Sequence, residues 1–308
     1  MSRIVLMIVL HLPGTMSADV IKVMHLTGQS SKHHSWEATA DAINQHLASA
    51  GLFGVDIVTS PARGEGMDEF APRFKDYDVV VLNYDGEEWS IQTKTDFVEY
   101  VREGGGLVTV HATCNSFAYW PEYNEIIGVG GWGGAKHYNP PLYPDQPERE
   151  SSRNEKWGPR VYWEDRGMVR DDIPGVAKHP RKHDFIITRR TPDHPITSGL
   201  PGQWQQPHDE IYSGLRGPAK NLTILATAYA NQDLKNASPH NEPMIFTVGY
   251  GKGRVLQITL GHVGARDNAS VLSVSNVGFG TVLQRGVEWA ATGSVTQTVP
   301  DDFPAVAR

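Results

Sequence analysis

The feature that most constrains the fold of this chain is a series of short apolar runs separated by amphipathic segments. Residues 77–86 read YDVVVLNYDG, with four apolar residues in a row, and residues 107–111 read LVTVH. An apolar run without polar alternation is typical of a strand covered on both faces, as in a parallel sheet between two layers of helices. We therefore predict an α/β fold: a doubly wound, mainly parallel sheet with helices on both faces.

Two segments between these runs have helical periodicity. In residues 35–51, Ser35 suits the N-cap position and Gly51 ends the pattern, and residues 91–106 end in three glycines. Shorter signals predict strands at 20–28, 55–60, 184–190 and 222–228, a hairpin at 244–262, and helices at 117–127 and 279–293.

These elements predict a single domain over residues 19–295, followed by a tail over 296–308. The stretch 129–183 interrupts the pattern, because it is rich in glycine, proline, aromatic and charged residues and has little periodicity. A long stretch of this kind inside a compact domain is typical of a functional loop. We therefore predict a loop or lid insertion there.

The first 18 residues have two interpretations. They contain one arginine, a short apolar stretch and small residues near Ala18, as a minimal signal peptide does, but Met16 is an equally good start. The first interpretation predicts export and the second a cytoplasmic protein. No other segment approaches the ~20 apolar residues that a membrane-spanning helix needs.

Charge and cysteine content exclude several classes of partner and site. The formal net charge is −7 and there is no run of lysine or arginine, which argues against nucleic acids and anionic membranes as partners. Cys114 is the only cysteine, so neither an internal disulfide nor a cysteine-rich zinc site can form. A small-molecule ligand is the expected partner, and a homo-oligomer is left open.

Several stretches together resemble the ThuA-like (trehalose utilisation) family, in the order that the family has them. They are YDVVVLN, FVEYVREGGGLVTVHATCNSFAYWPEYNEIIG, DHPITSGLP followed by HDEIY, YGKGRVLQITLGH and LQRGVEWAATG. The resemblance covers most of residues 20–293, and the stretch from about 138 to 180 departs from it as an insertion. It implies a flavodoxin-like fold of the class I glutamine amidotransferase type. It also implies a role in the metabolism of trehalose-like disaccharides or their keto-sugar derivatives.

The strand at 107–111 ends at a histidine, and the only cysteine follows three residues later. In the amidotransferases that the fold resembles, this strand leads into a sharp turn with a nucleophilic cysteine. A thiolate nucleophile needs a base within hydrogen-bond reach, and nothing in the sequence places one beside Cys114. We therefore predict that His111 belongs to the site and that Cys114 is a small semi-buried residue. A cysteine-dependent, amidase-like activity is the weaker alternative.

The predicted catalytic residues are His111, His262 and Glu210. His262 ends its strand as His111 does, and a carboxylate in the loop of Glu210 could orient a histidine or act as a general base. Imidazole can both accept and donate a proton near neutral pH. The predicted substrate-binding residues are His34, His137, His208, Asp209, Trp120 and Tyr123. For Trp120 and Tyr123, packing of a helix onto the sheet is the competing interpretation.

Histidines also raise the question of a metal. Three or four of them with a carboxylate would suit zinc, manganese or iron. The candidate ligands are His34, His111, His137, His208 and His262. No pair has the HExxH spacing, so a metal-free polar sugar pocket fits equally well and no cofactor is predicted. A non-catalytic sugar-binding module is the alternative to an enzyme, and it predicts that these histidines scatter over different faces.

Overall fold

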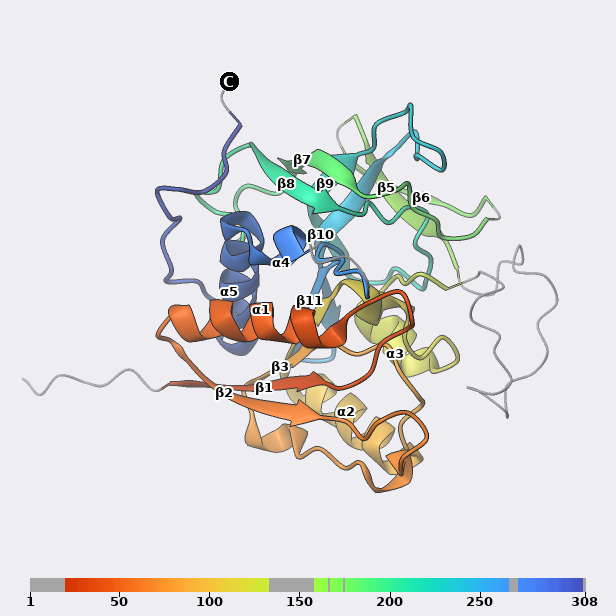
Figure 1. Cartoon of the computed structure of the whole chain (residues 1–308), viewed down its shortest axis with the longest axis vertical. Helices are drawn as coiled ribbons and strands as arrows, with labels where there is room; N and C mark the ends of the chain where they lie inside the picture. Colours follow the sequence, from red (N-terminus) through yellow and green to blue (C-terminus); the bar gives the residue numbers. More distant parts are fainter. Residues whose placement is uncertain (1–19, 133–157, 166, 174, 266–270, 307–308) are drawn as a thin grey trace, which may run out of the picture.

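The computed structural model describes residues 20–132, 158–165, 167–173, 175–265 and 271–306 (Figure 1). One sheet runs through the molecule in the order β2-β1-β3-β4-β11-β10-β9-β7-β8. The first five strands in this order pair in parallel: β2 (Phe53–Thr59), β1 (Ile21–Thr27), β3 (Val79–Leu82), β4 (Gly106–Val110) and β11 (Gly253–Ile258). The predicted α/β fold with a mostly parallel core is confirmed.

The other half of the sheet is antiparallel. It consists of β10 (Asn241–Tyr250), β9 (Leu222–Tyr229), β7 (His183–Arg189) and β8 (Gln203–Asp209). The predicted hairpin at 244–262 is present as β10 and β11. No strand was expected at β8, because its sequence QWQQPHD is polar and contains a proline. Proline is tolerated where a strand lies at the edge of a sheet, as β8 does.

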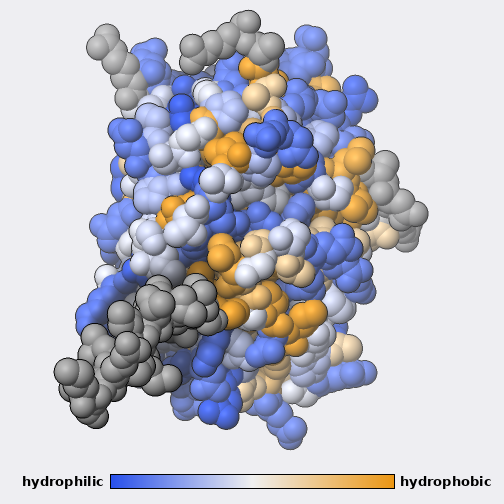
Figure 2. All heavy atoms as spheres, turned by 90° about the vertical axis from the view of Figure 1, so that its left-hand side faces the viewer, coloured by the Kyte–Doolittle hydropathy of each residue, from blue (hydrophilic) through white to orange (hydrophobic). Residues whose placement is uncertain are grey.

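Helices cover both faces of the parallel strands (Figure 1). The helices α1 (Trp36–Ser49) and α5 (Val277–Thr292) pack on one face, and α2 (Ile91–Glu103) and α3 (Pro121–Ile127) pack on the other. In β3, Val79 and Val81 face the first layer whereas Val80 and Leu82 face the second, so all four are buried. This explains the unbroken apolar run in the sequence. Figure 2 shows the surface of one face, on which hydrophobic residues form patches among hydrophilic ones.

The predicted helix ends are set by local hydrogen bonds. The Ser35 hydroxyl accepts a hydrogen bond from the backbone N–H of Ala38 at the start of α1. Gly104 ends α2 with a φ of 125°, a conformation that side chains rarely adopt. Short helices fill the remaining connections: η1 (Met67–Glu69), η2 (Phe74–Asp76), η3 (His111–Asn115) and α4 (Leu272–Ser275).

The stretch 129–183, predicted as a loop or lid, contains regular structure where it is described. The strands β5 (Arg160–Glu164) and β6 (Gly167–Asp171) form a hairpin that joins the sheet through β10. The hairpin is half-exposed, so its sequence lacks the strong apolar pattern that would have revealed it. Residues 133–157 lie outside the described part of the chain.

The two ends of the chain differ in how far the structure describes them. The predicted tail packs against the domain, with the Phe303 ring 5.7 Å from that of Trp204. The N-terminal 18 residues lie outside the described part, so neither interpretation of them is tested. Among the described residues, no helix is long and apolar enough to cross a bilayer.

Parallel pairing has one consequence for the site. The strands β1, β3, β4 and β11 all end at the same edge of the sheet, so the residues that follow them lie close together. Ligand sites of open α/β sheets lie at this carboxyl edge.

Candidate functional site

The turn after β4 begins with His111, which has a φ of 44°. A histidine in this left-handed region is uncommon, and such strained residues concentrate at functional sites. The ring is buried, and its Nδ1 lies 2.8 Å from the carbonyl oxygen of Thr259. Because a carbonyl only accepts hydrogen bonds, Nδ1 carries the proton in the neutral ring and Nε2 carries the free lone pair.

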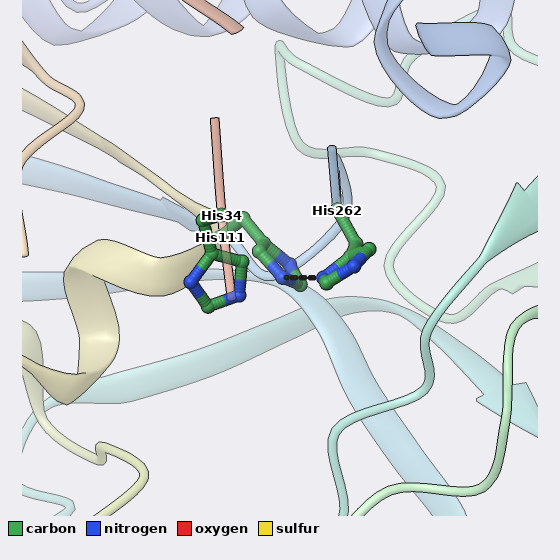
Figure 3. Close-up of side chains that lie close together, drawn as sticks. All are labelled: His34, His111 and His262. Carbon is green, nitrogen blue, oxygen red and sulfur yellow. Dashed lines mark hydrogen bonds between the residues drawn. The ribbon is translucent and has the colours of Figure 1, made fainter. Parts of the chain in front are cut away.

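Three imidazoles from separate segments meet at this edge (Figure 3). His34 lies between β1 and α1, His111 follows β4, and His262 follows β11. Their ring centroids are 4.9 to 5.2 Å apart, and His111 Nε2 lies 3.2 Å from His262 Nδ1. We call these three residues the histidine cluster. Three of the histidines predicted for the site therefore lie together.

Glu210 adds a buried carboxylate to the histidine cluster. Its Oε2 lies 3.2 Å from His262 Nδ1 and 3.9 Å from His111 Nε2. Its Oε1 lies 3.3 Å from Nδ1 of His179, and the Tyr212 hydroxyl lies 2.9 Å from His111 Nε2. His179 and Tyr212 were not among the site residues predicted from the sequence. Tyr212 belongs to the HDEIY motif, which was a usable signal, but His179 lies in the supposed insertion and had none.

Burial and mutual contact set the charges in this group. Burial lowers the pKa of His34 to about 3, with a further contribution from His262, and it lowers the pKa of His111 well below its usual value. Burial alone would raise the pKa of Glu210. The hydrogen bond and charge of His262, with His179 and His34, outweigh burial and lower this pKa. Two neutral imidazoles therefore lie beside an ionised carboxylate.

Asp209 has a different role from its neighbour. Its two carboxylate oxygens accept hydrogen bonds from the backbone N–H groups of Gly261, His262 and Glu210 and from the side chain of Gln206. It is fully buried, and burial raises its pKa to about 6 against the effect of these hydrogen bonds. Asp209 therefore joins the His262 segment to the end of β8 through hydrogen bonds, whereas the sequence predicted a substrate-binding role for it.

Two other predicted binding residues lie elsewhere in the fold. Trp120 and Tyr123 are buried among aromatic rings, with centroid distances of 4.9 to 6.1 Å linking Trp89, Phe117, Trp120 and Tyr123. We call these four residues the aromatic cluster. The Tyr123 hydroxyl donates a hydrogen bond to the carbonyl of Thr113. Both residues therefore agree with the competing interpretation, in which they pack a helix onto the sheet.

The remaining predicted site residues are His208 and His137. His208 is half-buried at the end of β8, and its backbone N–H donates to Asp184. Its ring nitrogens are not part of the group formed by the described residues His34, His111 and His262. His137 lies outside the described residues.

A small pocket opens beside the histidine cluster at the start of α1. It is lined by His34 and His111 together with Asn83, Asp85 and Ser30. Asp85 and Asn83 were not singled out in the sequence, although they lie at the end of the stretch 77–86 that was predicted as a strand. Amide, carboxylate and hydroxyl groups of this kind are suitable partners for sugar hydroxyls.

Cys114 is fully buried on the other side of the turn, in the same core as the aromatic cluster. Burial raises the pKa of its thiol to about 12. A thiol in this state is not a nucleophile near neutral pH, because the thiolate is the reactive form.

The histidine cluster has the donor set of a metal site. His34, His111 and His262 each offer one ring nitrogen, and these atoms all lie within 4.8 Å of one another. Imidazole nitrogen is a common ligand of zinc and other first-row transition metals.

Comparison with known proteins agrees with this arrangement of elements. A family described as trehalose utilisation, ThuA, matches residues 22–290. A ThuA-like protein from Parabacteroides merdae is 41% identical, with a TM-score of 0.82 over 93% of this chain and 95% of that one. A ThuA-like protein from Bacteroides uniformis shares the fold at 14% identity, with a TM-score of 0.55 over 92% of this chain and 97% of that one. No curated protein matches the chain.

Proposed function

Because the chain belongs to the trehalose utilisation family, ThuA, we propose that it is an enzyme of carbohydrate metabolism. It acts on trehalose-like disaccharides or their keto-sugar derivatives at the histidine cluster. The observation that supports this most is the convergence of His34, His111 and His262 with the buried carboxylate of Glu210.

A keto sugar gives this group of residues a definite task. The hydrogen on the carbon next to a carbonyl can be removed by a base if the charge that develops on the carbonyl oxygen is stabilised. Glu210 is the base, and its Oε2 lies 3.9 Å from His111 Nε2 and 3.2 Å from His262 Nδ1. Asp85 and Ser30 line the small pocket beside the cluster and offer polar groups to a sugar hydroxyl.

The energetics of burial favour an enzyme over a sugar-binding module. A buried carboxylate gives up its hydration, and Glu210 stays ionised because its contacts with the neighbouring histidines lower its pKa. A module that only binds sugar could use exposed polar groups and aromatic faces and would need no such arrangement. The cysteine-dependent alternative is disfavoured by the buried thiol of Cys114, whose pKa is raised to about 12.

The test is turnover of 3-keto-trehalose and of trehalose by the wild type and the His111→Ala variant. Exchange of the α-hydrogen for deuterium, followed by NMR in heavy water, reports the proposed proton transfer directly. We expect the variant to lose about 100-fold or more in kcat, a typical contribution of acid–base catalysis. The matched control is His240→Ala, because His240 pairs with Glu164 and stacks on Tyr162 in another part of the molecule.

Two results would contradict the proposal. Equal rates for His111→Ala and the wild type would show that the histidine cluster is not the site of reaction. Tight binding of a disaccharide by the wild type, without conversion or deuterium exchange of any of the substrates, would indicate a sugar-binding module.

A further inference from the structure

We infer that the histidine cluster holds a divalent transition-metal ion, with His34, His111 and His262 as its three protein ligands. Glu210 lies beside the open coordination position and remains the base. The inference rests on the proposed function for the identity of the substrate, but not for the presence of the ion. It supplies what the proposed reaction requires, an electrophile next to the carbonyl oxygen.

The first argument is the orientation of the rings. His111 donates Nδ1–H to the carbonyl of Thr259, which leaves the Nε2 lone pair facing His262. His34 contacts the hydroxyl of Ser31 through Nδ1 at 3.0 Å, which leaves its Nε2 free for the cluster. Histidines that bind metals use this arrangement, in which one nitrogen is held by an outer hydrogen bond and the other binds the ion.

The second argument is distance. Three nitrogens around a tetrahedral ion at about 2.0–2.1 Å lie about 3.4 Å from one another. His111 Nε2 and His262 Nδ1 are already 3.2 Å apart, and no pair in the set exceeds 4.8 Å. The ring of His34 has to close the difference. It lies in the connection between β1 and α1, outside the strands and helices of the sheet.

Glu210 and Tyr212 are compatible with an ion at this place. The negative charge of Glu210, with Oε2 at 3.2 Å from His262 Nδ1, offsets part of the charge of the ion. The Tyr212 hydroxyl, which contacts His111 Nε2, has a second hydrogen-bond partner in Asn115. It can therefore release the His111 lone pair without losing every partner.

The ligand set favours a first-row transition ion. Magnesium and calcium prefer oxygen ligands, whereas three imidazoles suit zinc, cobalt, manganese or iron. Three protein ligands leave a position open, as in catalytic zinc sites. An ion held there would supply an electrophile for the carbonyl oxygen of the keto sugar. Glu210 would take the proton from the neighbouring carbon, the electron pair of the C–H bond would pass into the enolate, and the proton would then return to carbon, so no oxidant or reductant is needed.

The test measures metal binding without reference to turnover. Protein freed of metal by a chelator is titrated with Zn²⁺ by calorimetry and with Co²⁺ by visible absorption. We expect one ion per chain and the intense bands of four-coordinate Co²⁺. The variants His34→Ala, His111→Ala and His262→Ala are each expected to weaken binding by at least about 100-fold, more than a loss in the outer shell causes. His240→Ala should bind like the wild type.

Glu210→Gln separates the ligands from the base. We expect this variant to keep Zn²⁺ affinity within about 10-fold of the wild type, because it leaves all three imidazoles in place, and to lose deuterium exchange. Failure of the wild type to bind close to one ion, or equal binding by His111→Ala, would overturn the inference. If a histidine variant does not fold, the Co²⁺ spectrum of the wild type still reports the coordination number and the kind of ligand atoms around the ion.

The inference and the proposed function can fail separately. Wild-type protein that exchanges the sugar hydrogen but binds no ion would retain the proposed function and overturn the metal site. Protein that binds one ion through the histidine cluster but converts no sugar would retain the metal site and overturn the proposed function.

Discussion

The two sides of the turn after β4 differ in what they contribute. On one side His111 meets His34, His262 and Glu210, and polar atoms face one another in a buried place. On the other side Cys114 lies in the core that contains the aromatic cluster. The same five-residue helix, η3, supplies both residues. The polar side offers groups for chemistry, and the apolar side holds the turn in place.

The two sides of the turn differ in whether burying their side chains stabilises or destabilises the folded protein. Burying a large aromatic ring stabilises the fold by roughly 1.5–3 kcal/mol, with more from contacts between rings. Burying a carboxylate or an imidazole costs free energy unless it is fully paired. Substitutions on the histidine side should therefore affect activity, and substitutions on the aromatic side should affect stability. The following predictions test that division, beginning with the largest expected effect.

Glu210→Gln should lower kcat by about 100-fold to 10,000-fold, because it removes the proposed base without changing the shape of the side chain. The Tm should fall modestly, because the contacts that lower the pKa of Glu210 stabilise its ionised form in the folded protein and the amide loses that stabilisation. Steady-state kinetics and a melting curve of the same preparation check both parts. A large loss of stability with nearly normal kcat would reverse the assignment of this residue.

Trp120→Ala should lower the free energy of unfolding by about 3–5 kcal/mol, because it opens a cavity in the aromatic cluster. Denaturant unfolding measures the loss, and kcat measured on the folded fraction should stay near the wild-type value. Trp120→Phe, which retains most of the ring contacts, is the control and should lose much less. If Trp120→Ala instead raises KM strongly in a stable protein, Trp120 binds substrate as the sequence predicted.

Glu242 shows what burial does to a glutamate without imidazole neighbours. Burial raises its pKa from 4.5 to about 7, against hydrogen bonds from Ser238 and Gly214. The folded state therefore retains a proton that the unfolded chain loses, and stability falls as the pH rises from 4.5 to 7. The difference amounts to up to about 3 kcal/mol. Unfolding of the wild type and Glu242→Gln across this range should show a steeper fall in the wild type. Parallel pH profiles would contradict this account.

Asp209→Asn should cost about 2 kcal/mol of stability, because the new amide group faces a backbone N–H that has lost its acceptor. The variant also tests Asp209 as a positioning residue for His262. We expect kcat to fall while KM changes little, together with weaker Zn²⁺ binding. Unchanged stability and a raised KM would instead support the substrate-binding role predicted from the sequence.

Cys114→Ala should have the smallest effect. The side chain is buried and makes no contact with the histidine cluster that the chemistry requires, so kcat should match the wild type. The lost sulfur contacts should cost about 1 kcal/mol of stability, on the scale of a single buried methylene. A loss of turnover in a stable Cys114→Ala protein would revive the cysteine-dependent alternative.

The sequence by itself determined the parallel half of the fold and the edge of the sheet at which the candidate site lies. Strands such as β3 and β4 were predictable because burial on both faces demands an unbroken apolar run. His111 and His262 could be paired in advance, since parallel strands bring their carboxyl ends together whatever their separation in the chain. The edge strand β8 and the hairpin of β5 and β6 were not predictable, because partly exposed strands carry no comparable pattern.

Only the tertiary structure decided which side chains enter the site. Asp209 and Glu210 are neighbours in the sequence and both carry a carboxylate. Asp209 accepts hydrogen bonds from the backbone N–H groups of Gly261 and His262, whereas Glu210 contacts the imidazole of His262. His179 and Tyr212 likewise reach the site through contacts distant in the chain. The physical reason is that hydrophobic patterns are local and repeat with the secondary structure. The partner of a buried polar group is chosen by the packing of segments far apart in the sequence.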